Sequence, residues 1–163
     1  PGASVKTTWM VGSAEDFIAA SIKGADNPQA PQSLHSIGAS SIEVLGDKAL
    51  AETRMVLMLR APLDGVEVDI TAWGRVVDFF VRHHGRWCIQ QRHPIHEKDR
   101  MDPVDPAAVI KLDTARLASL PTAYRHITYM QSLQGATITP DLVQHNSPEQ
   151  ALLYQTAQDW LRG

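Results

Sequence analysis

Two side chains in the sequence have the right type and setting for acid–base or anion chemistry. His35 lies in Leu34-His35-Ser36-Ile37, inside a segment that we predict to be a strand, and shares a face with Ile37 and Ala39. A histidine on such a face can act as a general base or acid, because its ordinary pKa is about 6.5. The alternative is a hydrogen-bonded, half-buried histidine without a catalytic role.

Arg92 is the second candidate, near the end of another predicted strand, 86–95. Regular alternation would place Cys88, Gln90 and Arg92 on one face, opposite Trp87, Ile89 and Gln91. We therefore expect Trp87 and Ile89 to be buried against a helix. Arg92 can stabilise a developing anion or a leaving group. The alternative for Arg92 is a structural ion pair with Asp78 or Glu52.

Other residue patterns give little support to metal, nucleotide or nucleophile chemistry. His93 and His96 are three apart, so they should diverge on a strand, and His83-His84 falls in a turn. The single cysteine, Cys88, excludes an internal disulfide and a cysteine-built zinc site. The chain has none of the glycine-rich nucleotide motifs and no GxSxG. We predict no metal and no cofactor.

Composition indicates one folded domain. The chain has 163 residues and 44% hydrophobic residues, and its net charge of -3 argues against nucleic-acid or anionic-membrane binding. The longest apolar run, 55–59, is too short for a membrane helix. The start of the chain lacks a signal-peptide pattern, and one cysteine suits a reducing compartment, so we expect a cytoplasmic protein.

The elements that must position these side chains follow from periodicity and turn residues. Helical spacing predicts a helix from Ser13 to Gly24. We then expect an antiparallel meander of four strands, at 32–45, 48–60, 66–81 and 86–95. A charged linker or loop follows at 96–105. Three helical stretches complete the chain, at 106–120, 123–133 and 148–161. This order predicts an α+β fold whose curved sheet and helices enclose a small-molecule pocket.

Several of these segments, in this order, resemble a known family. They begin with Phe17 in the predicted helix after Gly12. The others are Leu34-His35-Ser36-Ile37-Gly38, Leu45-Gly46-Asp47-Lys48-Ala49-Leu50-Ala51-Glu52, Gly74-Arg75-Val76-Val77-Asp78 and Gly85-Arg86-Trp87-Cys88-Ile89-Gln90-Gln91-Arg92. The set resembles the SnoaL-like branch of the nuclear transport factor 2-like superfamily over about residues 10–100. That resemblance implies a cone, in which a curved antiparallel sheet wraps around a hydrophobic pocket. It divides the chain into a cone domain, 1–105, and a helical C-terminal extension, 106–163, packed on the same domain.

The resemblance also implies roles for individual residues. His35 matches a strand histidine that removes a proton in the dehydratase and dehydrochlorinase members, and Arg92 matches an arginine that assists the leaving group. The expected substrate contacts are Ile37, Met55, Leu57, Trp73, Cys88 and Gln90. Family members carry two further helices and a short strand before the segment that begins here at Pro1. That part supplies the aspartate partner of the histidine, so this partner is not in the present chain.

The function expected from the resemblance is that of a cofactor-independent lyase or isomerase for an apolar, aromatic or polycyclic small molecule. Two alternatives stay open: a non-catalytic binding or association module, and the small subunit of a ring-hydroxylating dioxygenase. We also expect a homodimer or homotrimer, because the predicted second strand is apolar on both faces: Val56 and Met58 on one side, Met55, Leu57 and Leu59 on the other.

Overall fold

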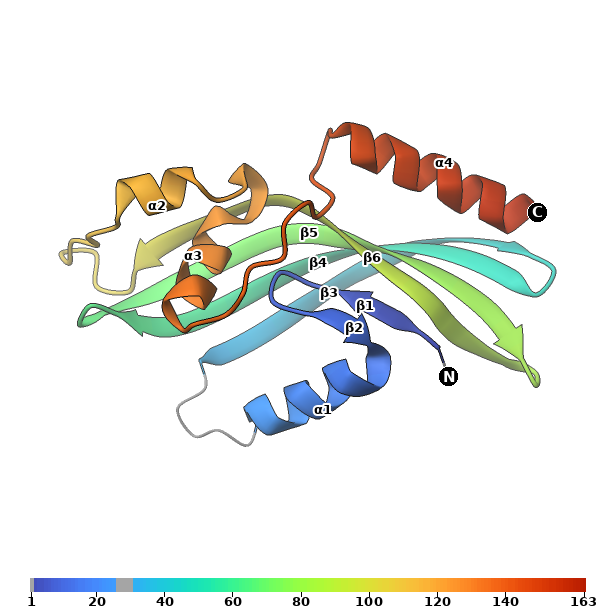
Figure 1. The fold of residues 1–163 in the computed structure, drawn as a ribbon, viewed down its shortest axis with the longest axis horizontal. Helices are drawn as coiled ribbons and strands as arrows, with labels where there is room; N and C mark the ends of the chain where they lie inside the picture. Colours follow the sequence, from blue (N-terminus) through green and yellow to red (C-terminus); the bar gives the residue numbers. More distant parts are fainter. Residues whose placement is uncertain (1, 26–30) are drawn as a thin grey trace.

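The computed structural model describes residues 2–25 and 31–163, which build a six-stranded mixed sheet with helices at both ends (Figure 1). The strand order is β2-β1-β6-β5-β4-β3. Neighbouring strands run antiparallel except β1 and β6, which are parallel. The strands are β1 (Ser4–Lys6), β2 (Val11–Ser13), β3 (Gln32–Leu45), β4 (Lys48–Leu63), β5 (Val66–His83) and β6 (Arg86–Pro103). The predicted α+β class and the antiparallel meander are confirmed.

Short turns join the four long strands. Asp64-Gly65 and His84-Gly85 have positive φ at both residues, between 47° and 82°, and this is the geometry of a type I′ hairpin. Glycine reaches such angles without strain, and the aspartate or histidine before it tolerates them better than a β-branched residue would. These turns fix the register from which every inward and outward side chain follows.

The strands are longer than the sequence predicts. β6 continues through 96–103, which we predicted as a linker or loop. This prediction was wrong because charged side chains do not end a strand that has one face in water. Arg100 lies opposite Thr71 and forms an ion pair with Asp102, which lies opposite Asp69. The short strands β1 and β2, which flank the turn around Thr8, were not predicted.

The helices are α1 (Ala14–Ala25), α2 (Thr114–Ala118), the single 3₁₀ turn η1 (Thr122–Tyr124), α3 (Arg125–Leu133) and α4 (Pro148–Arg162). Ser13 caps α1 by accepting the Asp16 amide at 3.0 Å, and Ser147 caps α4 through the Gln150 amide. The predicted helix 106–120 shrinks to α2, which begins only after the cap residue Asp113. No helix of the described ranges is long and apolar enough to cross a membrane.

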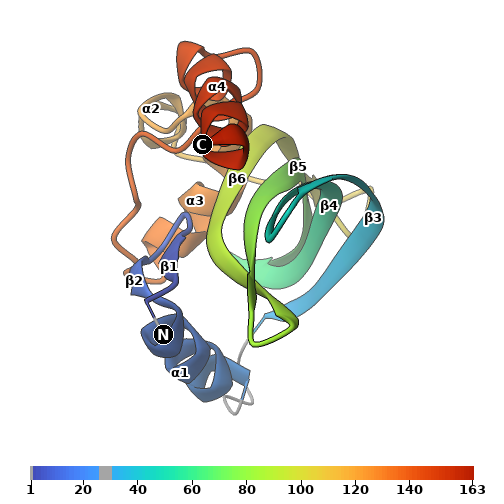
Figure 2. The same cartoon turned by 90° about the vertical axis from the view of Figure 1, so that its right-hand side faces the viewer.

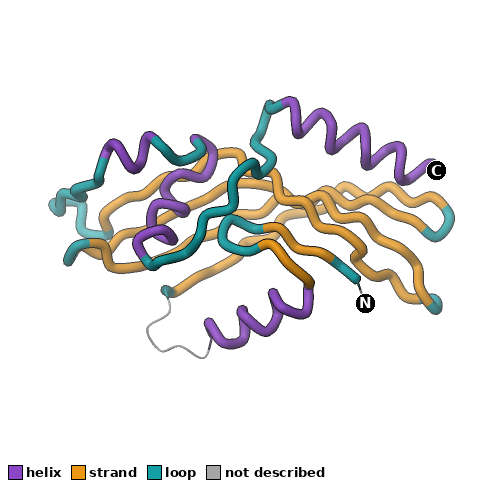
Figure 3. The backbone as a smooth tube through the Cα atoms, viewed as in Figure 1, coloured by secondary structure: helices purple, strands orange, loops and turns teal. Residues whose placement is uncertain are grey.

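The sheet has two faces, which are covered at opposite ends (Figures 1 and 3). We call the face that carries the odd-numbered residues of β4 and the even-numbered residues of β5 the inner face, and the other the outer face. At one end, η1 and α3 pack on the inner face around Ala61, Val68 and Ile70. At the other end, α4 packs on the outer face around Leu50, Val77 and Phe79. The remaining half of the inner face is therefore open, and Figure 2 shows the long strands curling around it.

Candidate functional site

The open half of the inner face carries a cavity of about 570 Å³. Its walls are largely apolar and come from the four long strands; the lining residues are Ile37, Ser40, Ile42, Val44, Ala49, Ala51, Thr53, Met55, Val76, Asp78, Phe80, Trp87 and Arg92. Its charged groups are Asp78 and Arg92. Such a surface suits a ligand that is mostly apolar and carries one electronegative group.

Asp78 and Arg92 form a two-pronged ion pair at the wall of this cavity. They are directly opposed on β5 and β6, and Nε and Nη2 of Arg92 donate to the two carboxylate oxygens at 2.7 and 2.8 Å. Asp78 is 3% exposed, whereas the Arg92 side chain is 48% exposed. The hydrogen bond to Asp78 raises the pKa of Arg92, against the lowering effect of burial. The ion pair with Asp78, which was the alternative to a functional role for Arg92, is confirmed, and it orients a guanidinium that stays charged and accessible.

A β-bulge places Arg92 on the same face as Trp87 and Ile89. Gln91 lies opposite Phe79 and Ile89 lies opposite Phe80, so Gln90 is the extra residue. This extra residue reverses the alternation that we predicted for the strand. The expected burial of Trp87 and Ile89 was also wrong, since they are 39% and 38% exposed. Trp87 instead lines the cavity, where Arg82 stacks on its ring at 4.6 Å.

His35 lies on the inner face too, but not in this cavity. It is exposed and lies opposite Leu57, which in turn lies opposite Ala72. Arg92 lies opposite Asp78, six residues further along β5 than Ala72. At about 3.3 Å per residue, the position of β5 in line with His35 and the position in line with Arg92 are about 20 Å apart along the strand. A single small ligand therefore does not reach both side chains.

The other predicted substrate contacts divide between the two faces. Ile37 and Met55 line the cavity, and Leu57 lies on the inner face beside the core under α3. Trp73 and Cys88 lie on the outer face, opposite Val56 and Val81, and Gln90 is exposed at the bulge. A second bulge, at Gly38 and Ala39, places Ser40 rather than Ala39 in line with Ile37.

The sequence analysis missed a buried histidine–carboxylate pair on the inner face. Asp99 of β6 lies opposite Ala72, and its side chain is fully buried. It accepts hydrogen bonds from Nδ1 of His126 at 2.8 Å and from the amides of His126 and Ile127 at the start of α3. The sequence placed His126 in the predicted helix 123–133 and Asp99 in a segment that we interpreted as a loop, so their contact, 27 residues apart in the chain, was not foreseeable.

Four further histidines lie in β6 and at the turn before it. His93 and His96 lie on opposite faces, as predicted, because they pair with Val77 and Gly74. Burial lowers the pKa of His93, and it lowers that of His96 to about 4. His83, at the end of β5, and His84, in the turn that follows, are exposed. Across residues 2–25 and 31–163, no group of three or more histidine, cysteine, aspartate or glutamate side chains could hold a metal ion.

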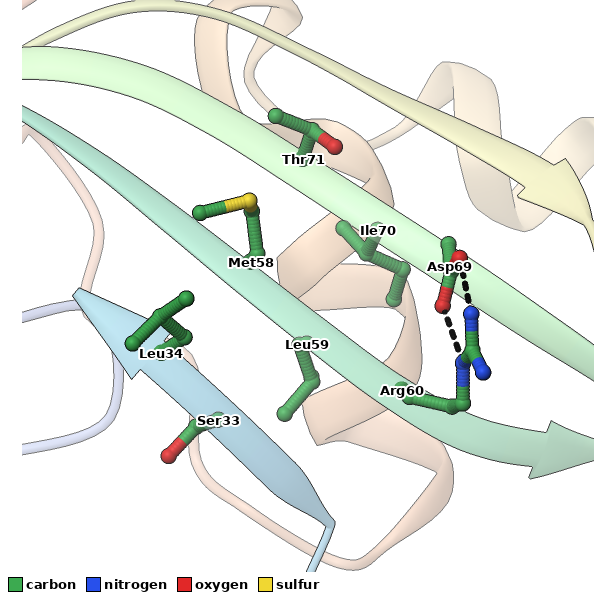
Figure 4. Close-up of a pocket in the computed structure, with 8 residues that line it drawn as sticks. All are labelled: Ser33, Leu34, Met58, Leu59, Arg60, Asp69, Ile70 and Thr71. Carbon is green, nitrogen blue, oxygen red and sulfur yellow. Dashed lines mark hydrogen bonds and ion pairs between the residues drawn. The ribbon is translucent and has the colours of Figure 1, made fainter. Parts of the chain in front are cut away.

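A smaller cavity of about 380 Å³ lies chiefly on the outer face, at the end opposite α4 (Figure 4). Leu34, Met58 and Thr71 line it beside the ion pair of Arg60 and Asp69, in which both nitrogen–oxygen distances are 2.7 Å. Both charged side chains are nearly half exposed. This is the uncovered surface on which the homo-oligomer prediction depends, and the association itself stays a prediction.

Comparison with known proteins gives a consistent assignment. The SnoaL-like domain model matches residues 3–93. A PEP2-like protein and pea pathogenicity protein 2, both from Fusarium vanettenii, are each 32% identical to the chain. An uncharacterized protein of Emericella nidulans is also 32% identical. Each alignment covers 100% of this chain and 74% of the relative.

Proposed function

Because the chain belongs to the SnoaL-like domain family, we propose that it binds an apolar small molecule on the inner face of its sheet and catalyses a cofactor-independent elimination or isomerisation of it. The observation that carries this proposal is the open cavity of about 570 Å³, with its apolar walls and the accessible guanidinium of Arg92. A cavity of this size and character is typical of small-molecule sites.

In this proposal the apolar walls hold the ring system and Arg92 binds an electronegative oxygen, halide or acid group. Asp78 occupies two donors of the guanidinium and leaves the others free for a ligand. Trp87 and Phe80 offer aromatic surface on the same wall.

His35 is the candidate base of the catalytic part, which requires the substrate to extend from the cavity along the inner face to His35. It is exposed on the same face, and in its neutral form imidazole removes a proton from a carbon made acidic by a neighbouring group. Its separation of about 20 Å from the level of Arg92 favours a second candidate function, a binding module without catalysis. In that case the cavity around Arg92 binds the ligand, and His35 has no part in the function.

A fluorescent probe tests the binding part directly. Anilinonaphthalene sulfonate combines a fused aromatic ring with one anion, which matches the apolar walls and Arg92. We expect Arg92→Ala to weaken its binding by tenfold or more, since a charge-assisted contact is lost. Arg60→Ala is the matched control, because it removes the same kind of aspartate ion pair from the outer face. Equal weakening in both variants would refute the assignment of this cavity.

A model elimination tests the catalytic part. The β-hydroxy ketone formed from benzaldehyde and acetone loses water to give benzylideneacetone, which is followed by ultraviolet absorbance. His35→Gln should lower the turnover by about 10²–10⁴ with unchanged melting. Undiminished turnover in His35→Gln, or no turnover in the unmodified protein, would leave the binding module as the function.

A further inference from the structure

The strand β3 forms a free edge of the curled sheet (Figure 2). Within the part of the chain that the structure describes, β3 pairs only with β4, so its other side offers unpaired N–H and C=O groups. Natural proteins protect such edges by short strands, charged side chains or proline. From Leu34 to Leu45 the strand has no lysine, arginine or proline, and its ionisable side chains are His35 and Glu43. This edge is therefore open to pairing with another strand.

The side chains of β3 also expose apolar surface on both faces of the sheet. Its five large apolar side chains are each more than half exposed, between 52% and 64%; they are Leu34, Ile37, Ile42, Val44 and Leu45. Together they expose roughly 500 Å² of apolar surface, the size of the largest such patches on ordinary monomers. A stable interface buries about 800 Å² of each partner, and the backbone of the free edge adds to the side-chain area. A contact along the whole of β3 thus approaches the size of a stable interface.

The pattern of apolar residues selects one register for two copies of β3. The bulge at 38–39 occupies one position of the ladder, because Ile37 and Ser40 lie opposite β4 residues that are only two apart. An antiparallel pair centred on Ser40 then sets apolar side chains against apolar ones. The pairs that this register forms, each of them twice, are Ile37 with Ile42, Leu34 with Leu45, His35 with Val44, and Ser36 with Glu43.

Other registers match these residues less well. A shift by two positions sets Leu34 opposite Glu43 in one direction and Leu45 opposite Ser36 in the other. A shift by one position turns the inner face of one copy to the outer side of the other. Charge also permits the register centred on Ser40, because the two Glu43 carboxylates then lie about 20 Å apart along the strands and each faces a serine hydroxyl.

We propose that two copies of the chain form a dimer by antiparallel pairing of their β3 strands, centred on Ser40, so that the two sheets become one continuous sheet. The two-fold axis of such a pair is perpendicular to the sheet, so the inner faces of both copies lie on the same side. Ile37, Ser40 and Ile42 line the cavity of about 570 Å³. In the dimer the partner's β3 extends the wall of each cavity beside these residues. This inference concerns association and does not rest on the proposed ligand or catalysis.

The molar mass in solution tests the dimer. Sedimentation velocity at micromolar concentration should show a species of twice the chain mass of 18.0 kDa. Ile42→Lys should dissociate it, because each copy would then set a lysine against Ile37 of the other. Leu152→Lys is the matched control and should leave the dimer intact, since Leu152 on α4 is 66% exposed and Ile42 is 64% exposed. A monomer, a trimer, or a dimer that survives Ile42→Lys would overturn the proposal.

A further variant separates this interface from the uncovered outer face. Met58→Lys should leave the dimer intact, because Met58 lies on β4, one strand inside the edge. Dissociation by Met58→Lys but not by Ile42→Lys would assign the association to the outer face instead.

A cysteine at the proposed centre tests the register. The exposed Cys88 is first replaced by serine. Ser40→Cys then sets two thiols opposite each other, and oxidation should join two chains through a disulfide. Ser36→Cys is the control, because its two thiols lie about 20 Å apart along the strands in this register and should stay unlinked. A missing cross-link in Ser40→Cys, or equal cross-linking of both variants, would refute the register. This test uses only serine-to-cysteine changes at the edge, so it decides the interface even where a lysine variant fails to fold.

Discussion

Removal of Arg92 should cost far more stability than removal of Arg60, although each forms a two-pronged ion pair with an aspartate. In Arg92→Ala the carboxylate of Asp78, which is 3% exposed, loses its partner. Breaking a fully buried pair costs about 3–5 kcal/mol. The guanidinium is 48% exposed, so solvent screening reduces the expected loss to about 2–3 kcal/mol.

Thermal melting monitored by circular dichroism measures this difference. For a chain of this length, the loss corresponds to a Tm decrease of roughly 4–12 °C. Arg60→Ala should change Tm much less, because its partner Asp69 is exposed and is rehydrated when the arginine is removed. Adding Asp78→Asn to Arg92→Ala should recover part of the loss, since the buried charge is removed. Equal Tm decreases in the two single variants would refute the reasoning that burial of the carboxylate sets the cost.

Two further predictions concern the centre of the sheet. Burial lowers the pKa of His96 from about 6.5 to about 4. Between these pH values the unfolded chain binds a proton that the native protein does not bind. The free energy of unfolding should therefore fall by about 2 kcal/mol from pH 7 to pH 5 because of His96. The lowered pKa of His93 acts in the same direction. Urea denaturation of His96→Phe should therefore show a clearly smaller decrease in the free energy of unfolding between pH 7 and pH 5. An unchanged decrease would contradict the role of His96 in this pH dependence. Gly74→Ala should destabilise the protein by about 1–3 kcal/mol, because the added Cβ would lie 2.6 Å from the Ile95 carbonyl oxygen. Gly24→Ala, with no atom within 4 Å of the new Cβ, is the control and should be neutral or stabilising in the same denaturation assay.

The strands and turns of the meander could be predicted because their signals are local. Gly46-Asp47 and His84-Gly85 end one strand and begin the next, and β3 has the predicted bounds of 32–45. The family resemblance found in these segments is confirmed by the match over residues 3–93. Helix ends with a serine cap, at Ser13 and Ser147, were likewise located within a residue or two.

The candidate site was less predictable because bulges and distant contacts decide it. The extra residue Gln90 puts Trp87 on the face of Arg92, and no residue pattern in the strand announces it. The pair of Asp99 and His126 depends on how α3 packs on β6, which is a tertiary contact. Strand alternation and the family resemblance could therefore indicate His35 and Arg92 as site residues, but they could not show how far apart along the strands the two side chains lie.

The placement of helices at opposite ends and on opposite faces has a consequence for cooperativity. The core under α3 and the core under α4 are separate clusters, which are linked through the middle of the strands around Ala72 and Gly74 and through the adjacent residues Leu142 and Val143. We therefore expect each end to open as its own unit of local unfolding, with the mid-strand hydrogen bonds as the boundary between the two units; hydrogen exchange measures this directly.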